Sequence, residues 1–143
     1  MYFSLLTGSY NNNLQGGVLR QTMGSFGQKE VDPLTGAFTR ADGIVTSLDA
    51  IQIPNDYHSN TVQRDCGWIN NRAFRNGECR AWGNPIAEMM YEGMRYLAGA
   101  QQPTPQFNTS GGMDGRLGLS SASWDDPYST CLLYTSPSPR DRG

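Results

Sequence analysis

The sequence predicts a mixed α/β fold, on the basis of three observations. Two short segments, 2–6 and 18–26, have the apolar content or the alternation that is typical of β-strands. Residues 85–98 carry apolar side chains at the spacing of an α-helix. Between strands and helix lies a stretch, 55–83, that is rich in asparagine, glycine and arginine, and we expect it to be a long loop insertion.

The N-terminal part of the chain has the pattern of strands joined by turns. Residues 2–6 (YFSLL) are apolar enough for a buried strand, and 18–26 (VLRQTMGSF) alternate between two faces. Residues 11–13 (NNN), with glycines behind them, predict a polar turn between these strands. Residues 32–36 (DPLTG) predict another turn, because proline fixes φ and glycine accepts a positive φ. An extended segment is expected to follow at 37–40.

A first, short helix is expected at 42–53, where apolar residues recur at helical spacing. Asp42 can cap its first turn, and Pro54 ends the run. Further along, 101–112 (QQPTPQFNTSGG) is rich in residues that interrupt regular structure, so we expect an exposed connection. Residues 124–128 (WDDPY) predict one more turn with aromatic anchors.

The second helix, 85–98 (PIAEMMYEGMRYLA), has the clearer pattern. Asn84 is a good N-cap, and a proline suits the first helical position. Glu92 and Arg95 are predicted to pair on the exposed surface. One face of the helix is apolar, and we expect its methionines to pack in the core. The members of this face are Ile86, Met90, Gly93, Met94 and Leu97.

Composition argues against two classes of partner. The net charge is −2, and Lys29 is the only lysine, so no basic cluster is available to neutralise nucleic-acid phosphates. No apolar run approaches the roughly 18 residues that a membrane span requires. We therefore expect neither nucleic-acid binding nor a membrane span.

Two cysteines, Cys66 and Cys79, lie in the loop insertion. Their spacing is too wide for one arm of a zinc site, and no second arm is present. If the protein is exported, a disulfide is the better interpretation, and it would stabilise the fold by roughly 3 kcal/mol. The alternatives are two free buried thiols, or pairing with a cysteine outside this chain.

The last residues, 131–143, are predicted not to be native. Residues 131–141 read CLLYTSPSPRD, which is the translation of a transposase adapter used in preparing sequencing libraries. We expect the native sequence to end near Thr130. At the other end, MYFSLL lacks the basic region and the cleavage site of a signal peptide.

Three stretches resemble the PilY/PilC family, the large secreted adhesins and assembly factors of the type IV pilus tip. They are 5–20 (LLTGSYNNNLQGGVLR), 65–99 (DCGWINNRAFRNGECRAWGNPIAEMMYEGMRYLAG) and 123–128 (SWDDPY). The resemblance implies that residues 1–130 form an incomplete von Willebrand factor A-like domain, with a partly parallel sheet and flanking helices around the loop insertion. It implies a fragment of a pilus biogenesis factor and tip adhesin, and not an enzyme.

The resemblance also implies partners and a location. The partners would be pilins and minor pilins at the pilus tip, and a host or abiotic surface. The protein would be exported to the pilus tip, the outer membrane or the cell surface. No cofactor is expected within this fragment, whereas the full-length protein could bind a divalent cation, calcium or magnesium.

The expected cation site is the metal-ion-dependent adhesion site of von Willebrand factor A-like domains. Its Asp-x-Ser-x-Ser motif is absent from this chain. The turn that supplies the middle ligand is matched by 83–86 (GNPI), where Asn84 replaces the usual threonine. A carboxamide oxygen can coordinate a hard cation. The alternative is that Asn84 only caps the helix.

The residues are also compatible with two other functions. A secreted carbohydrate- or surface-binding module would expose three aromatic side chains on one face, although at least one is expected to anchor the core. These are Trp68, Trp82 and Trp124. An exported enzyme would have a pocket near His58 or the Asp125 turn. The acidic residues Asp65, Glu78, Asp125 and Asp126 are not paired by a rigid element, so a hydrolase dyad is unsupported. A turn-capping role is expected for Asp125 and Asp126, and contact with calcium is the alternative.

Overall fold

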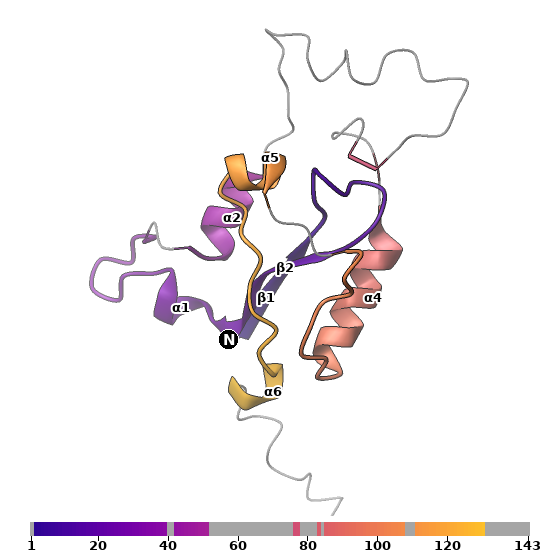
Figure 1. Cartoon of the computed structure of the whole chain (residues 1–143). Coiled ribbons are helices and arrows are strands. Elements are labelled where there is room, and N and C mark those ends of the chain that lie inside the picture. Colours follow the sequence, from indigo (N-terminus) through magenta and orange to yellow (C-terminus); the bar gives the residue numbers. More distant parts are fainter. Residues whose placement is uncertain are drawn as a thin grey trace, which may run out of the picture.

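Two antiparallel strands form the centre of the molecule (Figure 1). The computed structural model describes residues 2–39, 42–51, 76–77, 83, 85–107 and 111–130, and the statements below refer to these. Strand β1 spans Tyr2–Thr7 and strand β2 spans Val18–Ser25. Tyr2 lies opposite Ser25 and Thr7 opposite Val18, with irregular pairing between Phe3 and Leu6. Both strands confirm the sequence prediction.

The sheet and its helices confirm the α/β class in its coarse form. The expectation of a partly parallel sheet is not met in the described residues, where the pairing of β1 with β2 is antiparallel. An antiparallel pair needs only a short connection, and residues 8–17 supply it. The expectation that β1 is buried is wrong for its first half, since Tyr2 and Phe3 are exposed. A von Willebrand factor A-like arrangement is therefore not shown.

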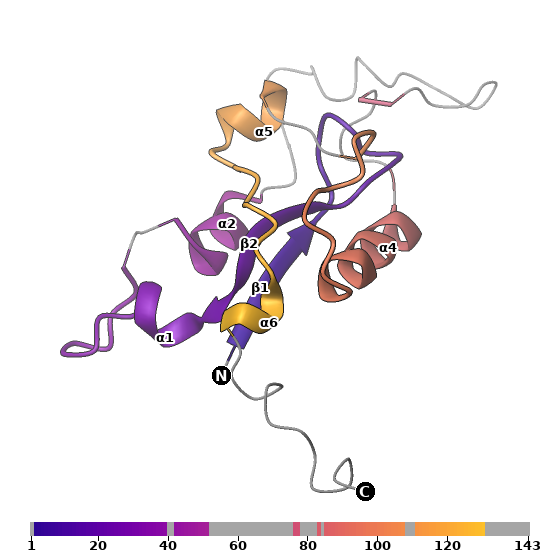
Figure 2. The ribbon, with the colours of Figure 1, turned by 60° about the horizontal axis from the view of Figure 1, so that its bottom comes forward.

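Helices lie on both sides of the strands, and this arrangement is visible in both Figure 1 and Figure 2. Helix α4 (Ile86–Leu97) lies on one side. Helices α1 (Phe26–Lys29) and α2 (Ile44–Ala50) lie on the other. Two further short helices, α5 (Gly112–Arg116) and α6 (Pro127–Thr130), follow in the chain.

The apolar core of the described residues is small. Its buried side chains are Val18, Leu19, Tyr96, Leu119 and Trp124. The rings of Tyr96 and Trp124 meet edge to face, with centroids 5.6 Å apart. The backbone N–H of Ala122 donates to the carbonyl of Leu19 at 2.7 Å, which fixes the segment before α6 against β2.

The predicted turn at 32–36 is confirmed. The Gly36 N–H donates to the Asp32 carbonyl at 2.8 Å, and Gly36 has a φ of 69°. Hydrogen bonds to the Asp32 carboxylate, first from the Leu34 N–H, lower the pKa of Asp32. A bridge between Val31 and Phe38 confirms the extended segment after the turn.

Helix α2 is confirmed, but its predicted cap is wrong. Asp42 makes no side-chain cap bond, and Gly43 is the N-cap residue. Instead, the buried Glu30 carboxylate accepts hydrogen bonds from the N–H groups of Ile44 and Val45, both at 2.7 Å. A carboxylate is stabilised there by the unpaired N–H groups of the first turn. The helix ends at Ala50, and Pro54 lies outside the described residues.

Helix α4 is confirmed in extent, whereas its orientation differs from the prediction. Most of the face predicted to be buried is turned outward: Met90 and Met94 are 64% and 62% exposed. Gly93 alone of that face lies inward as predicted, near Leu6. The inward side carries Glu92, Gly93 and Tyr96. The helix packs with this side because its backbone at Met89 lies very close to Gly17, at the end of the β1–β2 connection, where only a glycine leaves room. Pro85 is the N-cap, without a side-chain cap bond, and Asn84 lies outside the described residues.

Replacing Gly17 by alanine should push α4 away from the sheet. A Cβ atom at Gly17 would lie 2.8 Å from the Cα of Met89, a backbone atom that cannot move by itself. Overpacking of this kind costs about 1–3 kcal/mol. Urea unfolding should therefore show a lower free energy of unfolding for Gly17→Ala. The matched change Gly27→Ala meets nothing within 4 Å and should be neutral or slightly stabilising. Equal stability of the two variants would contradict the close contact.

Candidate functional site

A buried ion pair joins strand β2, near the start of the described chain, to helix α5, near its end. Arg20 of β2 and Asp114 of α5 meet at 2.7 Å between Nη2 and Oδ2, and both side chains are 0% exposed. Charges so deeply buried are tolerated only when they are paired and hydrogen-bonded. The pair therefore fixes α5 against the sheet although the two residues are 94 positions apart.

Every remaining donor direction of Arg20 is also used. Its Nε donates to the Thr7 hydroxyl at 2.9 Å, and its Nη2 donates to the Gly8 carbonyl at 3.0 Å. Its Nη1 donates to the carbonyls of Leu119 at 3.0 Å and Ser120 at 3.3 Å. A planar guanidinium with several fixed donors suits this role better than a lysine would. One side chain thus holds β1, the following connection and the segment after α5.

The asparagine turn lies next to this pair. Asp114 Oδ1 accepts from the Tyr10 N–H at 2.9 Å. Asn11 donates to the Gly111 carbonyl at 2.7 Å and accepts from the Met113 N–H at 3.1 Å. The turn is therefore bound to both sides of the start of α5.

Asn12 and Asn13 are buried, which the prediction of a polar turn did not include. Asn12 donates to the Gln106 carbonyl at 2.8 Å and accepts from the Asn76 side chain. Asn13 accepts from the Gly77 N–H at 2.8 Å. These amides connect the turn to segments far away in the sequence, since a carboxamide can donate and accept at once.

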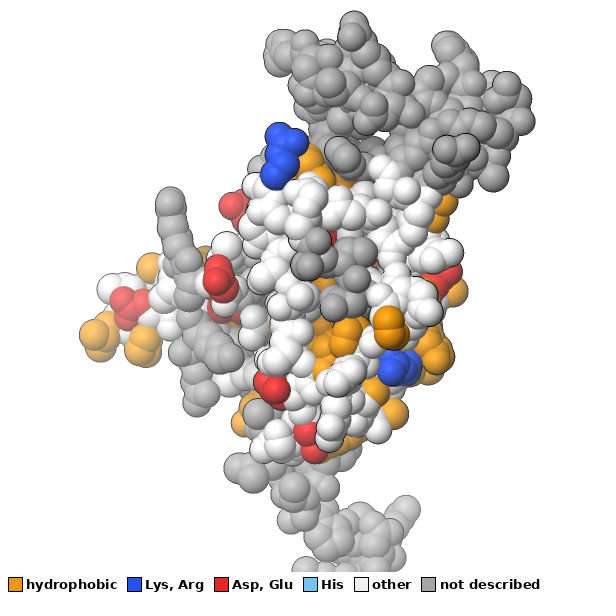
Figure 3. All heavy atoms as spheres, viewed as in Figure 1, with side chains coloured by type: hydrophobic (Ala, Val, Ile, Leu, Met, Phe, Trp, Pro, Cys, Tyr) orange, Lys and Arg blue, Asp and Glu red, His pale blue; other side chains and the backbone are white. Residues whose placement is uncertain are grey.

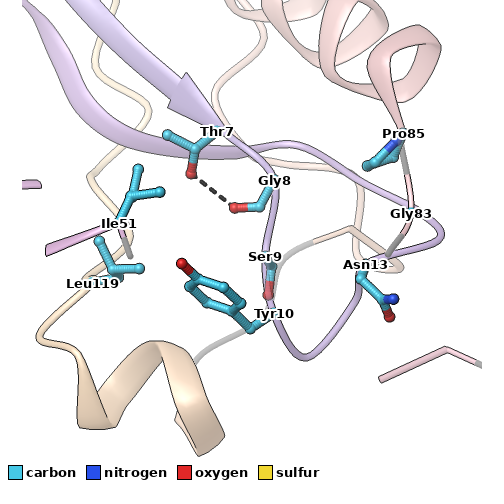
Figure 4. A pocket seen from close by; sticks show the side chains of 9 residues that line it. All are labelled: Thr7, Gly8, Ser9, Tyr10, Asn13, Ile51, Gly83, Pro85 and Leu119. Atoms are coloured by element: carbon cyan, nitrogen blue, oxygen red, sulfur yellow. Dashed lines mark hydrogen bonds between the residues drawn. The ribbon is translucent and has the colours of Figure 1, made fainter. Parts of the chain in front are cut away.

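A small pocket opens beside the turn (Figure 4). Its volume is about 190 Å³, below the usual range for small-molecule sites. Hydroxyl, amide and backbone groups line it together with apolar side chains. The lining residues are Thr7, Gly8, Ser9, Tyr10, Asn13, Ile51, Gly83, Pro85 and Leu119. The lining can offer hydrogen bonds and apolar contact to a ligand.

A second polar cluster fixes the connection after α4. Glu92 is fully buried and accepts from Thr104 twice, at 2.9 Å from the N–H and 2.5 Å from the hydroxyl. Arg95 donates to Glu92 at 2.8 Å. The predicted pairing of Glu92 with Arg95 is confirmed, but the pair is not an exposed one, because Thr104 covers the carboxylate. The Arg95 guanidinium also lies 5.4 Å from the Trp124 ring centroid.

The Tyr96 hydroxyl holds β2 from the helix side. It accepts a hydrogen bond from the Met23 N–H at 2.9 Å. Burial raises the pKa of the Tyr96 phenol, and the nearby Asp125 and Asp126 raise it as well, against a lowering by the Met23 N–H. The phenol is therefore neutral at physiological pH and serves α4 as a structural contact.

Several predicted site residues lie outside the described residues, and the expectations for them stay predictions. These are His58, Asp65, Cys66, Trp68, Glu78, Cys79, Trp82 and Asn84. Within the described ranges, no group of three or more histidine, cysteine or acidic side chains is placed to hold a metal ion. No helix in those ranges is long and apolar enough to cross a membrane.

The described residues of the C-terminal turn behave as structural groups. Trp124 is 8% exposed, so the prediction of a core anchor is confirmed and an exposed platform that includes Trp124 is wrong. Asp125 accepts from the Ser123 hydroxyl at 2.7 Å, and Asp126 accepts from the Tyr128 N–H at 2.9 Å. The predicted turn-capping role is confirmed for Asp126, whereas the bond to Asp125 comes from a side-chain hydroxyl and not from a backbone N–H.

Comparison with known proteins gives two matches. A family model described as "PilY1 homolog, second domain" matches residues 3–137. A "Type IV pilus biogenesis factor PilY1 homolog" from Xylella fastidiosa strain Temecula1 is 40% identical over 141 residues. The match covers 91% of this chain and 9% of that relative, so the chain spans less than a tenth of the relative's length. No solved structure matches. The non-native origin of 131–143 stays a prediction.

Replacing Asp114 by asparagine should destabilise the protein strongly. The Arg20 guanidinium would remain buried opposite a neutral amide, and breaking a buried pair in this way costs about 3–5 kcal/mol. The measurement is the free energy of unfolding in urea. The control Asp125→Asn changes an exposed carboxylate and should stay within about 0.5 kcal/mol of the parent. If both variants matched the parent, the ion pair would not hold the fold.

Proposed function

The chain belongs to the PilY1 homolog family, and from this membership we propose that it is one domain of a type IV pilus biogenesis factor and tip adhesin. The observation that carries the proposal is 40% identity over 91% of the chain to a type IV pilus biogenesis factor PilY1 homolog. The match of the second-domain family model to residues 3–137 supports it independently. The domain would act in pilus assembly and in surface attachment.

The geometry of the described residues suits a binding and structural role. The buried charged groups are used to hold segments together, as Arg20 with Asp114 and Glu92 with Arg95 demonstrate. General acid–base catalysis needs a titratable group that can reach a substrate, and these groups are already occupied by internal partners. We propose that this domain contributes no catalysis.

The proposed partners are pilins and minor pilins at the pilus tip, together with a host or abiotic surface. The protein would be exported to the pilus tip, the outer membrane or the cell surface. The von Willebrand factor A-like sheet, and a calcium or magnesium ion with Asn84 as one ligand, are proposed for the full-length protein. They would need strands and ligands beyond β1, β2 and the described helices.

Export makes a disulfide between Cys66 and Cys79 part of this proposal. Alkylation of the exported protein without reduction, followed by digestion and mass spectrometry, should give one cross-linked pair of peptides that contains both residues. Reduction before alkylation is the control and should release the two peptides. Two alkylated thiols in the unreduced sample would contradict the pairing.

The pilus role is tested in a bacterium that carries the full-length gene. The strain with Asp114→Asn should lose surface pilin, toward the level of a strain from which this segment has been deleted, because the domain loses its buried ion pair. The Asp125→Asn strain should keep normal surface pilin. Immunoblots of sheared surface fractions measure pilin, and adhesion per unit of surface pilin separates attachment from assembly. Normal piliation and normal adhesion in the deletion strain would overturn the proposed function.

A further inference from the structure

Helix α4 is apolar on the side that faces away from the sheet. On the inward side, Gly93 lies near Leu6 of β1 and Tyr96 packs on β2, while Met89 lies against Gly8 and Gly17 of the connection between the strands. The outward face of α4 is apolar, and each of its large side chains is 46% to 64% exposed. It consists of Ile86, Met90, Tyr91, Met94 and Leu97. In Figure 3 the surface on the α4 side shows apolar side chains, with charged side chains among them.

The outward face also lacks charge of its own. The helix has three charged residues, Glu88, Glu92 and Arg95. Glu92 is buried and holds Arg95, whose guanidinium donates to Thr104 and the Gln102 carbonyl and lies 5.9 Å from the Tyr91 ring centroid, at the edge of the outward face. Glu88 is half-buried. A helix at the surface of a small domain ordinarily turns its polar side to solvent, whereas α4 turns its apolar face outward. A contiguous exposed apolar patch of this kind marks an interaction site.

We propose that the outward face of α4 is covered by another part of the same, longer polypeptide, through an uncharged apolar surface. The relative is far longer than the matched segment, since the match covers only 9% of it, so most of such a polypeptide lies outside the chain described here. A linked segment also has a high effective concentration at this face, which a second molecule lacks.

The small size of the described unit supports a linked partner. Its sheet has two strands, and a two-stranded sheet is marginal on its own in water. Only five apolar side chains are buried among the described residues. Covering α4 would add a second apolar layer on the far side of the helix. Methionine side chains adapt to irregular partner surfaces, which suits a contact between domains.

Peroxide oxidation of the full-length protein tests the proposal, because it converts accessible methionine to the sulfoxide. Met90 and Met94 are followed by mass spectrometry of digests, in native and in urea-unfolded protein. The internal reference is a Leu34→Met variant, because Leu34 is 94% exposed on the turn at 32–36. In native protein, Met90 and Met94 should be oxidised about tenfold more slowly than in unfolded protein, whereas the methionine at position 34 should be oxidised at the unfolded rate.

Three outcomes are distinguishable. Slow oxidation of Met90 and Met94 at every protein concentration supports a linked cover. Oxidation as fast as that of the reference would show that the face is open to solvent, and protection that disappears on dilution would show a second copy; either result overturns the proposal. The inference rests on family membership and not on the pilus role. The oxidation experiment can therefore fail while the piliation experiment succeeds, and the piliation experiment can fail while the oxidation experiment succeeds.

Discussion

The buried pair of Arg20 and Asp114 is the interaction on which the described fold depends. It joins β2 to α5 across 94 positions of sequence. The same guanidinium holds Thr7, Gly8 and the segment after α5, and the same carboxylate holds the Tyr10 N–H. A buried charge without its partner strongly destabilises the folded state, so separating any of these segments from the pair is unfavourable. The pair, together with the bonds of Asn11, Asn12 and Asn13, fixes the position of the asparagine turn and of the pocket beside it.

Other distant segments of the described residues are also joined by buried polar side chains that are hydrogen-bonded. Glu30 holds the start of α2, Glu92 holds Thr104, and Asn12 holds the Gln106 carbonyl. No buried side-chain nitrogen or oxygen in the described part of the chain lacks a hydrogen-bond partner. With so small an apolar core, hydrophobic burial alone would leave the arrangement of these loops poorly specified. Fully satisfied polar networks supply that specificity.

Elements with a local cause were predictable from sequence. Strands β1 and β2, the turn at 32–36 and helix α4 follow from alternation, turn chemistry and helical spacing, which need no knowledge of distant residues. Partners far apart in sequence were not predictable. Arg20 sits in an ordinary strand pattern and Asp114 among glycines, so neither carries a local signal of burial. The Glu30 cap was missed for the same reason, because Asp42 stood nearer to the helix.

Helix α4 turns a different side to the sheet than its helical spacing predicted. Helical spacing identified Ile86, Met90, Gly93, Met94 and Leu97 as the face to be buried, yet of these residues only Gly93 lies against the described sheet. Periodicity reports that a face is apolar, but it does not say which neighbour covers it. The inward side was chosen by backbone fit at Gly17 and by the Glu92–Thr104 contact, neither of which has an apolar pattern. In the described residues, α4 therefore packs on the sheet with its mixed polar side and leaves its apolar face exposed.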